Sequence, residues 1–257
     1  MSGFDVRAVD LAALNSLTKY PSIPTYHALD PSNGGLTEQP VPFTGAVLGT
    51  EKVDGTNSRI IVLPDGSYLL GSREELLYAQ GDLIGNPALG IVQHLRPLAE
   101  QLAGSGGDGL RVYYLELYGG RIGGQAKQYS ARGAHGWRLF DVALVDDLDE
   151  RLTWAPQRIS AWREGGGQAY LGEDELSATG LDLTPRLFTV DAAELPATVE
   201  GMSAFLAERL PRTLVALDDS GLGAAEGVVL RAADRSVIAK ARFQDYTRTL
   251  KRRAARG

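Results

Sequence analysis

The sequence predicts an α+β fold in which short strands are interspersed with helices. Two patterns carry this prediction. Short apolar runs rich in β-branched and aromatic residues, such as residues 110–117, predict strands. Longer segments in which apolar residues recur every three or four positions, at 5–18 and 87–103, predict amphipathic helices. No internal repeat is visible, so we expect a single domain over residues 1–257.

The composition is that of an ordinary soluble globular protein, and it excludes several kinds of site. Apolar residues make up 44% of the chain and charged residues 23%. Because there is no cysteine, disulfides, thiolate catalysis and cysteine-ligated zinc are excluded. No apolar run approaches the roughly 20 residues needed to cross a bilayer, and the N-terminus lacks the layout of a signal peptide. We therefore expect a cytoplasmic protein with no membrane partner.

Basic residues gather at the C-terminal end of an otherwise acidic chain. The formal net charge is −6, yet residues 240–257 hold seven lysines and arginines against one acid, Asp245. Charge clustered in this way binds phosphate groups even when the whole protein is acidic. The basic tail over 243–257 is therefore a candidate nucleic-acid surface, and the alternative is a solvated, frayed terminus.

The N-terminal part of the chain is expected to dock against the rest and to carry no chemistry. The helix predicted at 5–18 forms most of this N-terminal segment, residues 1–20. Pro21 and Pro24 then force an extended backbone, because proline fixes φ and biases the preceding residue away from helix. Residues 30–42 are rich in Pro, Gly, Ser and Asn and are expected to form a loop.

A polar stretch after the apolar run at 45–49 is the expected position of a reactive lysine. Lys52 is followed by Asp54-Gly55, a strong turn signal because glycine accepts positive φ at little cost. A second β run begins at Ser58, so we expect a hairpin. A lysine held this way becomes a nucleophile if it is partly desolvated or close to other cations. The alternative is a surface lysine beside a hairpin turn.

Three later residues stand out at or near the ends of predicted strands. Arg73 follows a strand and is either a site residue or the partner of a neighbouring glutamate in a surface ion pair. Glu116 lies between leucines late in the strand 110–117, where a carboxylate costs free energy unless it is paired or hydrogen-bonded. That makes Glu116 a site candidate in its own right. For Phe140, in the strand 137–142, packing in the core is the default interpretation.

Two motifs near the C-terminus combine an acid with two cations. Glu226 opens the run Gly-Val-Val-Leu, and one carboxylate is sufficient for Mg²⁺, which often takes only one or two protein ligands. In the following strand, alternation places Lys240 and Arg242 on the same face. We recognise no motif between Phe140 and Glu226. The predicted helices in this interval cover residues 154–163 and 202–210.

Taken in order, these motifs resemble those of the covalent nucleotidyltransferases, which comprise ATP-dependent DNA and RNA ligases and mRNA capping enzymes. Lys52-Val53-Asp54-Gly55 is similar to their first motif. The trailing Thr56-Asn57 is most similar to RNA ligases of the nick-sealing type. Four further segments match later motifs of the family in the same order: Glu116 on its strand, Phe140 on its strand, Glu226-Gly227-Val228-Val229, and Lys240-Ala241-Arg242.

The resemblance implies ligation through a lysyl-AMP intermediate. Lys52 would attack the α-phosphate of ATP in the presence of Mg²⁺ or Mn²⁺. AMP would then pass to a 5′-phosphate of RNA, and a 3′-hydroxyl would displace AMP and seal the strand. Lys52, Lys240 and Arg242 are the implied catalytic residues, and Glu226 is the implied metal residue. Many relatives carry lysine where this chain has Arg242, which binds phosphate well but cannot release a proton.

The resemblance also implies a set of nucleotide-binding residues. Arg73 and Glu116 would contact the ribose, the ring of Phe140 would stack on the purine, and Asp54 would orient the turn or the lysine. The full set implied for nucleotide binding is Glu51, Lys52, Asp54, Asn57, Arg73, Glu116, Phe140, Lys240 and Arg242.

The implied fold is an antiparallel-sheet nucleotidyltransferase domain of the ATP-grasp-like ligase kind. Only 15 residues follow Arg242, so we expect no C-terminal OB-fold, and an accessory protein could supply the missing domain. The expected partner is RNA, as a nicked duplex or as DNA or RNA ends, in an RNA repair role. Two alternatives remain open. One is another nucleotidyltransferase, such as a minimal DNA ligase or a GTP-using capping-type enzyme. The other is a non-catalytic nucleic-acid-binding module of the same fold.

Overall fold

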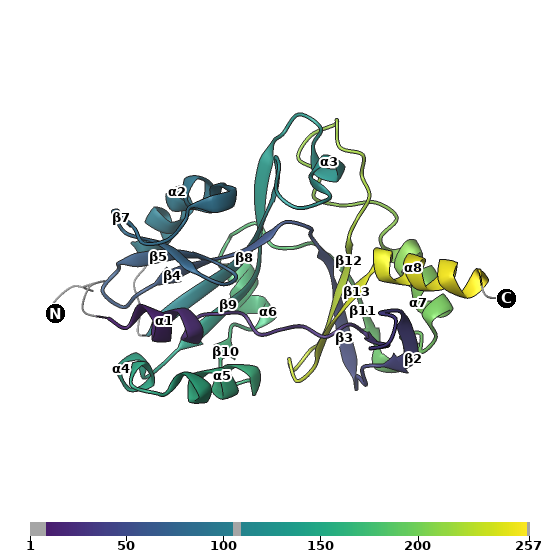
Figure 1. The fold of residues 1–257 in the computed structure, drawn as a ribbon, viewed down its shortest axis with the longest axis horizontal. Coiled ribbons are helices and arrows are strands. Elements are labelled where there is room, and N and C mark those ends of the chain that lie inside the picture. Colours follow the sequence, from purple (N-terminus) through teal and green to yellow (C-terminus); the bar gives the residue numbers. More distant parts are fainter. Residues whose placement is uncertain (1–8, 105–108, 256–257) are drawn as a thin grey trace. The chain divides into compact units, whose positions relative to one another are not determined.

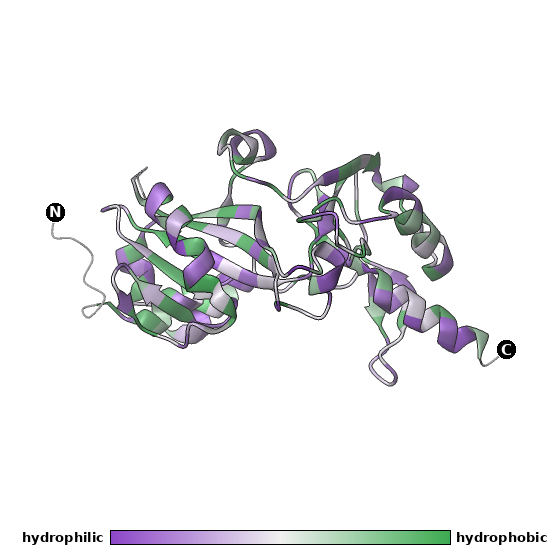
Figure 2. Cartoon of the chain, turned by 90° about the horizontal axis from the view of Figure 1, so that it is seen from above, coloured by the Kyte–Doolittle hydropathy of each residue, from purple (hydrophilic) through white to green (hydrophobic). Residues whose placement is uncertain are grey.

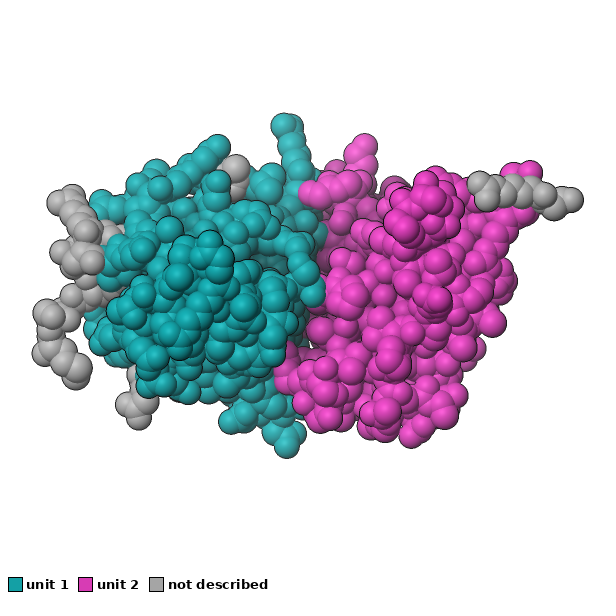
Figure 3. Space-filling model, turned by 60° about the horizontal axis from the view of Figure 1, so that its bottom comes forward, with its two compact units in different colours: residues 1–22, 55–122, 135–183 teal, residues 23–54, 123–134, 184–257 magenta. Residues whose placement is uncertain are grey.

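The computed structural model describes residues 9–104 and 109–255, which divide into two compact units (Figure 3). Each unit is assembled from three separate stretches of chain. Unit 1 comprises residues 1–22, 55–122 and 135–183, and unit 2 comprises residues 23–54, 123–134 and 184–257. None of the helices in the described part of the chain is long and apolar enough to cross a membrane.

Unit 1 is an antiparallel sheet flanked by helices (Figure 1). Its strands are Thr56–Val62 (β4), Tyr68–Ser72 (β5), Leu76–Ala79 (β6), Asp82–Leu83 (β7), Leu110–Gly119 (β8), His135–Val145 (β9) and Ala169–Tyr170 (β10). Its helices are Leu11–Leu17 (α1), the 3₁₀ turn Ala88–Gly90 (η1), Ile91–Ala103 (α2), Leu148–Leu152 (α4), Pro156–Glu164 (α5) and Glu173–Ala178 (α6). The strand order is β10-β9-β8-β4-β5-β6-β7.

The two faces of this sheet pack against different helices. Ile60 of β4 and Leu115 of β8 belong to the core that α2 completes with Leu95. The neighbouring Ile61 belongs to the core on the other face, which α1 completes with Leu14. Side chains alternate between faces along a strand, so β4 and β8 are apolar on both sides and read as nearly continuous hydrophobic runs. The same apolar runs predicted these strands from the sequence.

Unit 2 contains a second antiparallel sheet, of four strands in the order β11-β3-β12-β13, and a separate pair, β1 and β2. The strands are His27–Leu29 (β1), Leu36–Pro40 (β2), Ala46–Lys52 (β3), Arg186–Asp191 (β11), Gly227–Ala232 (β12) and Ile238–Arg242 (β13). The helices are Ala126–Tyr129 (α3), the 3₁₀ turn Ala192–Glu194 (η2), Val199–Arg209 (α7) and Phe243–Ala254 (α8). One core joins the sheet to α7 and α8 through Val228, Met202 and Tyr246. Figure 2 shows apolar residues along the strands of both sheets.

Strands β3 and β4 do not form the hairpin that the sequence predicts. β3 pairs with β11 and β12 in unit 2, whereas β4 pairs with β5 and β8 in unit 1. Local sequence marks two β runs and a turn between them, but it does not specify the partner of either strand. Asp54 and Gly55 therefore lie where the chain passes from one sheet to the other.

Gly55 is needed for space and not for the positive φ that the turn signal suggested. It is absent from the residues with positive φ. A Cβ atom at this position would lie 2.2 Å from the carbonyl oxygen of Leu117 in β8, far inside van der Waals contact. The Gly55 N–H also donates to Oε1 of Glu116 at 3.0 Å. The glycine thus lets the chain approach β8 closely.

The substitution Gly55→Ala is expected to destabilise the protein by about 1–3 kcal/mol, because the new methyl group must displace the β8 backbone. Urea unfolding measures the change in free energy. Gly124→Ala is the matched control, since a Cβ there meets nothing within 4 Å and φ is not positive. Equal stability of the two variants would contradict this account of Gly55.

The first predicted helix starts later than expected. α1 begins at Leu11, because the Asp10 side chain accepts hydrogen bonds from the N–H groups of Ala12 and Ala13 at 2.9 and 3.0 Å and caps the helix. Val9 therefore lies outside the helix. The part of the prediction that covers residues 5–8 falls outside the described residues.

The second predicted helix is also shorter than expected at its start. Leu89 and Gly90 have φ values of 60° and 70°, so α2 begins at Ile91 and not at residue 87. Pro97 lies inside the helix. Most of the glycine-rich segment that follows α2, residues 105–108, falls outside the described residues.

The predicted loop 30–42 contains a strand, and most of the basic tail, for which a frayed terminus was the alternative, is a helix. Within the predicted loop 30–42, β2 pairs with β1 and buries Leu36 in the core of unit 2. The basic tail is helix α8 as far as Ala254, and it buries Tyr246 and Thr249. In both cases a few buried side chains anchor a segment whose overall composition is polar.

Candidate active site

Three cations of the predicted site share one face of the sheet in unit 2. Lys52, Gly227 and Arg242 lie directly opposite one another across β3, β12 and β13. Lys240 lies two residues before Arg242 on β13, so alternation places it on the same face. The intervening Ala241 is buried in the core on the other face. The sheet thus brings Lys52 to the same face as Lys240 and Arg242.

Glu226 pairs with Lys52 in this structure. The Nζ atom of Lys52 lies 2.6 Å from Oε2 of Glu226, and the two side chains are 24% and 10% exposed. Glu226 lies just before β12 and immediately precedes Gly227, the residue opposite Lys52, so its side chain is close to the end of β3. Gly227 is required here, since a Cβ atom would lie 2.2 Å from the carbonyl oxygen of Ala241 in β13. The Glu-Gly pair therefore combines a charge with close strand packing.

The environment of Glu226 is that of a desolvated carboxylate among charges. Burial raises its pKa above the ordinary value, and the neighbouring Asp54 adds to this, while Lys52 and Arg242 lower the pKa but do not offset burial. Because burial disfavours the charged form of Glu226, an additional positive charge nearby would stabilise the ionised carboxylate. Glu226 is therefore suited to a cation.

The residues of unit 2 fit a hard divalent cation that keeps most of its water. The described residues contain no cluster of three or more His, Asp and Glu side chains that could form a protein cage for a metal ion. Mg²⁺ is usually held by one or two carboxylates together with water and substrate phosphates, and this requirement is met by Glu226.

Asp54 anchors the segment that follows Lys52. Its carboxylate Oδ2 accepts a hydrogen bond from the N–H of Gln125 at 2.9 Å, and its own N–H donates to the Tyr129 hydroxyl at 2.7 Å. Tyr129 is fully buried, and burial raises its pKa. Asp54 is thus tied to α3 and its flank through both its side chain and its backbone.

Arg242 is held by Asp245, the one acid among residues 240–257. Its Nε donates to Oδ2 of the buried Asp245 at 2.8 Å. The other oxygen of Asp245 accepts from Arg248 at 3.1 Å. This leaves further N–H groups of Arg242 for a phosphate, because a guanidinium carries five donors.

Glu51 lies on the opposite face of β3 from Lys52, and the structure does not bring its carboxylate to the cations. The side chain is buried, and its oxygens accept hydrogen bonds from the Thr213 hydroxyl at 2.5 Å and the Leu214 N–H at 2.8 Å. Adjacent residues of a strand point to opposite faces, so period-two alternation could have separated Glu51 from Lys52. Its side chain fixes the segment 213–214 to the sheet.

Glu51→Gln is expected to lower the free energy of unfolding by about 1–3 kcal/mol, because an amide cannot accept both hydrogen bonds. Chemical denaturation measures this loss, and attachment of nucleotide to the folded variant is expected to stay near the wild-type rate. A variant with wild-type stability and no attachment would restore Glu51 to the nucleotide-binding set.

The candidates of unit 1 line up across three strands. Asn57 of β4 and Arg138 of β9 both lie directly opposite Glu116 of β8. Glu116 is on the same face as Tyr114, which belongs to the core covered by α1. Asn57, Glu116 and Arg138 therefore form a polar row on the same face of the sheet, next to the apolar core. Arg138 was not singled out from the sequence, and its only signal there is its position two residues before Phe140.

Phe140 occupies an irregular position that alternation cannot predict. Tyr114 pairs with Asp141 and the next residue of β8 pairs with Leu139, so Phe140 is the extra residue of a β-bulge. Its ring lies edge-on to Tyr20 at 5.1 Å and stacks on Tyr114 at 6.2 Å between centroids. These contacts correspond to the core-packing interpretation. The purine contact stays a prediction.

Arg73 is at the surface, just after β5. Its side chain is 58% exposed and its Nε lies 3.4 Å from Oε1 of Glu74. This is the surface ion pair given above as the alternative. Such exposed pairs contribute little to stability, so Arg73 is free to take another partner at small cost.

Two residues that shape unit 2 were missed from the sequence. Tyr129 holds the backbone of Asp54, and Thr213 holds the carboxylate of Glu51. Tyr129 ends the short helix α3 and Thr213 lies in a loop, and neither segment has a recognisable motif or a periodic pattern in the sequence. Only the fold reveals these two roles.

Comparison with known proteins places the chain in a family. The model of the family described as RNA ligase matches residues 45–248, which is well over half of the chain. The chain therefore belongs to the RNA ligase family. The matched region includes every predicted site residue, from Glu51 to Arg242. No curated protein matches the chain.

Solved structures support the fold. The RNA ligase of Naegleria gruberi with pyrophosphate matches with a TM-score of 0.54 and 16% identity, over 92% of this chain and 59% of that one. A variant of the same ligase with ATP and Mn matches with a TM-score of 0.51 and 15% identity, over 92% and 63%. This chain thus spans about three fifths of the length of those ligase chains. At this identity the likeness shows the fold, a mixed fold with antiparallel sheets.

Proposed function

We propose that this chain is an ATP-dependent RNA ligase that joins 3′-hydroxyl and 5′-phosphate ends through a lysyl-AMP intermediate on Lys52. One observation carries the proposal: Lys52, Lys240 and Arg242 share one face of a sheet, and Glu226 lies 2.6 Å from the Lys52 amine. Membership of the RNA ligase family supports the choice of reaction, and the similar Naegleria gruberi ligase with ATP and Mn supports the choice of nucleotide and metal.

In the first step the amine of Lys52 forms a bond to the α-phosphorus of ATP, and pyrophosphate leaves. The amine must be unprotonated to attack, so its ion pair with Glu226 has to open and its proton has to pass to solvent or pyrophosphate. Glu226 would hold a divalent cation, which would neutralise charge on the phosphates. Lys240 and Arg242 stabilise the negative charge that develops on the α-phosphate.

In the later steps Lys240 and Arg242 stabilise negative charge on the phosphates of the RNA intermediates. The 5′-phosphate oxygen of one RNA end attacks the phosphorus of lysyl-AMP and releases Lys52. The 3′-hydroxyl of the other end then attacks the activated 5′-phosphate, and AMP leaves. Each step exchanges one bond to phosphorus for another, so positioning and charge stabilisation provide most of the acceleration.

Covalent labelling tests the first step. The protein is incubated with α-labelled ATP and a divalent cation, in parallel with α-labelled GTP, and run on a denaturing gel. We expect label from ATP that is stable to base and labile to acid, as a phosphoramidate is. Transfer to nicked duplex RNA then tests ligation. Folded, nucleotide-free protein that takes label from neither nucleotide would overturn the proposal.

A further inference from the structure

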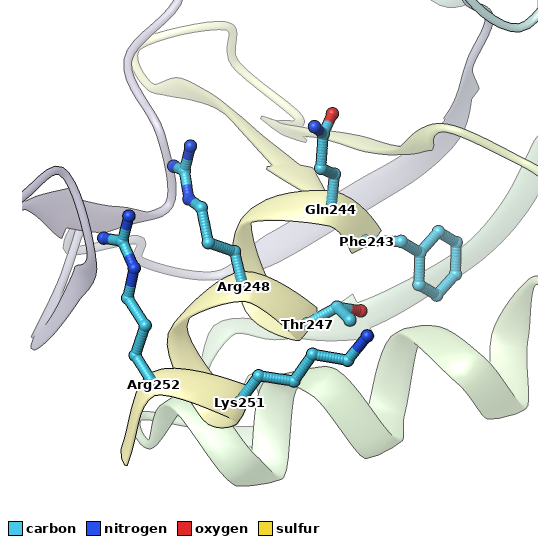
Figure 4. A pocket seen from close by; sticks show the side chains of 6 residues that line it. All are labelled: Phe243, Gln244, Thr247, Arg248, Lys251 and Arg252. Atoms are coloured by element: carbon cyan, nitrogen blue, oxygen red, sulfur yellow. The ribbon is translucent and has the colours of Figure 1, made fainter. Parts of the chain in front are cut away.

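Helix α8 presents a basic groove on its exposed side (Figure 4). The helix buries Asp245, Tyr246 and Thr249. The opposite side lines the groove with residues one turn apart: Phe243, Gln244, Thr247, Arg248, Lys251 and Arg252. Figure 4 shows Arg248 and Arg252 extending to one side of the helix and Lys251 to the other. Three cations therefore border the groove and no acid lines it.

The two arginines are held in place with donors to spare. Arg248 donates to the carbonyl oxygen of Gly34 at 2.9 Å and to Asp245 at 3.1 Å. Arg252 donates to the carbonyl oxygen of Asn33 at 2.6 Å. A guanidinium has five N–H donors, so each arginine keeps free donors while its direction is fixed. A side chain that is already ordered loses less entropy when it binds a phosphate.

Lys251 is the most available charge on the helix. In the described part of the chain it forms no ion pair, in contrast to Arg253 on the same turn. Arg253 donates to Glu200 at 2.9 Å and is also paired with Glu38. Lys251 and Arg253 are both positively charged and lie on the same turn. The charge of Arg253 is neutralised within the protein, whereas the charge of Lys251 is open to a ligand.

We propose that the exposed side of α8 is a docking surface for the phosphate backbone of the RNA substrate, with Arg248, Lys251 and Arg252 as the contacts. The inference rests on RNA being the substrate. The choice of a phosphate backbone as the ligand follows from charge. The chain is acidic overall, with a net charge of −6, but positive charge is concentrated on this helix, which therefore attracts a polyanion. Backbone contacts of this kind position a nucleic acid without reading its sequence.

The surface is physically linked to the predicted active site. Both oxygens of buried Asp245 are used, one by Arg242 at 2.8 Å and one by Arg248 at 3.1 Å. Arg242 ends β13 and α8 follows without a loop. RNA bound to α8 would therefore be held at a fixed position relative to Arg242, the residue that is expected to contact the α-phosphate.

Binding of nicked duplex RNA at several salt concentrations tests the surface. The test variant is Lys251→Ala/Arg252→Ala, and the matched control is Arg253→Ala, which removes a paired cation from the same turn. Affinity falls as salt rises, and we expect this fall to be shallower in the double variant. The slope of log affinity against log salt should decrease in magnitude by about 1.5, since each lost phosphate contact removes about 0.7–0.9. The control should leave the slope within error. Thermal unfolding checks that each variant folds.

Labelling with ATP in the absence of RNA separates this inference from the ligase reaction. We expect the double variant to label at the wild-type rate, because α8 contacts RNA and not ATP. If the double variant binds RNA with the wild-type slope, or if Arg253→Ala loses as much, the docking surface is wrong and the ligase reaction stands. If the wild type takes no label but the double variant still loses RNA affinity, the ligase reaction fails and the surface stands.

Discussion

Lys52→Ala is expected to abolish covalent attachment of AMP. Alanine has no group that can attack phosphorus. The chain has five lysines, so peptide mapping of the wild-type adduct can assign the modified residue without ambiguity. Measured as label on a denaturing gel, the loss should exceed about 1,000-fold, the scale of removing a covalent nucleophile.

Lys19→Ala is the control for Lys52→Ala. Lys19 also forms an ion pair with a glutamate, its Nζ lying 2.8 Å from Glu74, and its side chain is 26% exposed. The two lysines thus resemble each other in partner and burial, and differ in position. We expect full labelling of the Lys19 variant. Label that persists in Lys52→Ala would move the nucleophile to another residue.

Glu226→Gln is expected to slow attachment of AMP by roughly 100-fold, on the scale of losing one preorganised electrostatic contact in a polar site. Glutamine keeps the shape of the side chain but removes the charge that faces Lys52 and would face a cation. The variant should need a higher concentration of Mg²⁺ or Mn²⁺ to reach its own half-maximal rate. Labelling rates at a series of metal concentrations measure both effects.

Stability distinguishes a role in the reaction from a role in folding. Burial raises the pKa of Glu226, so the neutral glutamine removes a desolvated charge. The Lys52 side chain is 24% exposed, so water can solvate its charge when the partner is lost, and we expect Glu226→Gln to unfold at nearly the wild-type denaturant concentration. Glu200→Gln, which removes an exposed carboxylate paired with Arg253, is the control and should label normally. A Glu226→Gln variant that labels at the wild-type rate at all metal concentrations would remove Glu226 from the site.

The sequence predicted the elements better than their pairing. The apolar runs of β4, β8 and β12 were placed within a few residues, because burial on a sheet leaves a local pattern. The hairpin expected around Asp54 was wrong, since the choice of partner strand depends on residues more than 100 positions away, as with β3 and β12. The bulge at Phe140 is equally invisible, because it is a property of two strands together.

For the candidate site, the sequence supplied the residues and the structure supplied their grouping. Alternation correctly placed Lys240 and Arg242 on one face. The same rule, applied to the neighbouring Glu51 and Lys52, would have shown that their side chains point apart. The contacts of Tyr129 and Thr213 could not be predicted, because a four-residue helix and a loop are both too short or too irregular to leave a periodic pattern in the sequence.

The strand that carries Lys52 has a consequence for synthesis of the protein. In the sheet, β3 lies between β11 and β12, which begin at Arg186 and Gly227. During translation β3 emerges early and stays without either neighbour until most of these residues have left the ribosome. The candidate site around Lys52 is therefore assembled late, and a chain that ends before β12 lacks the strand that pairs with β3 as well as Lys240 and Arg242 of β13. If the proposed reaction is right, only chains that extend through β13 are expected to consume ATP.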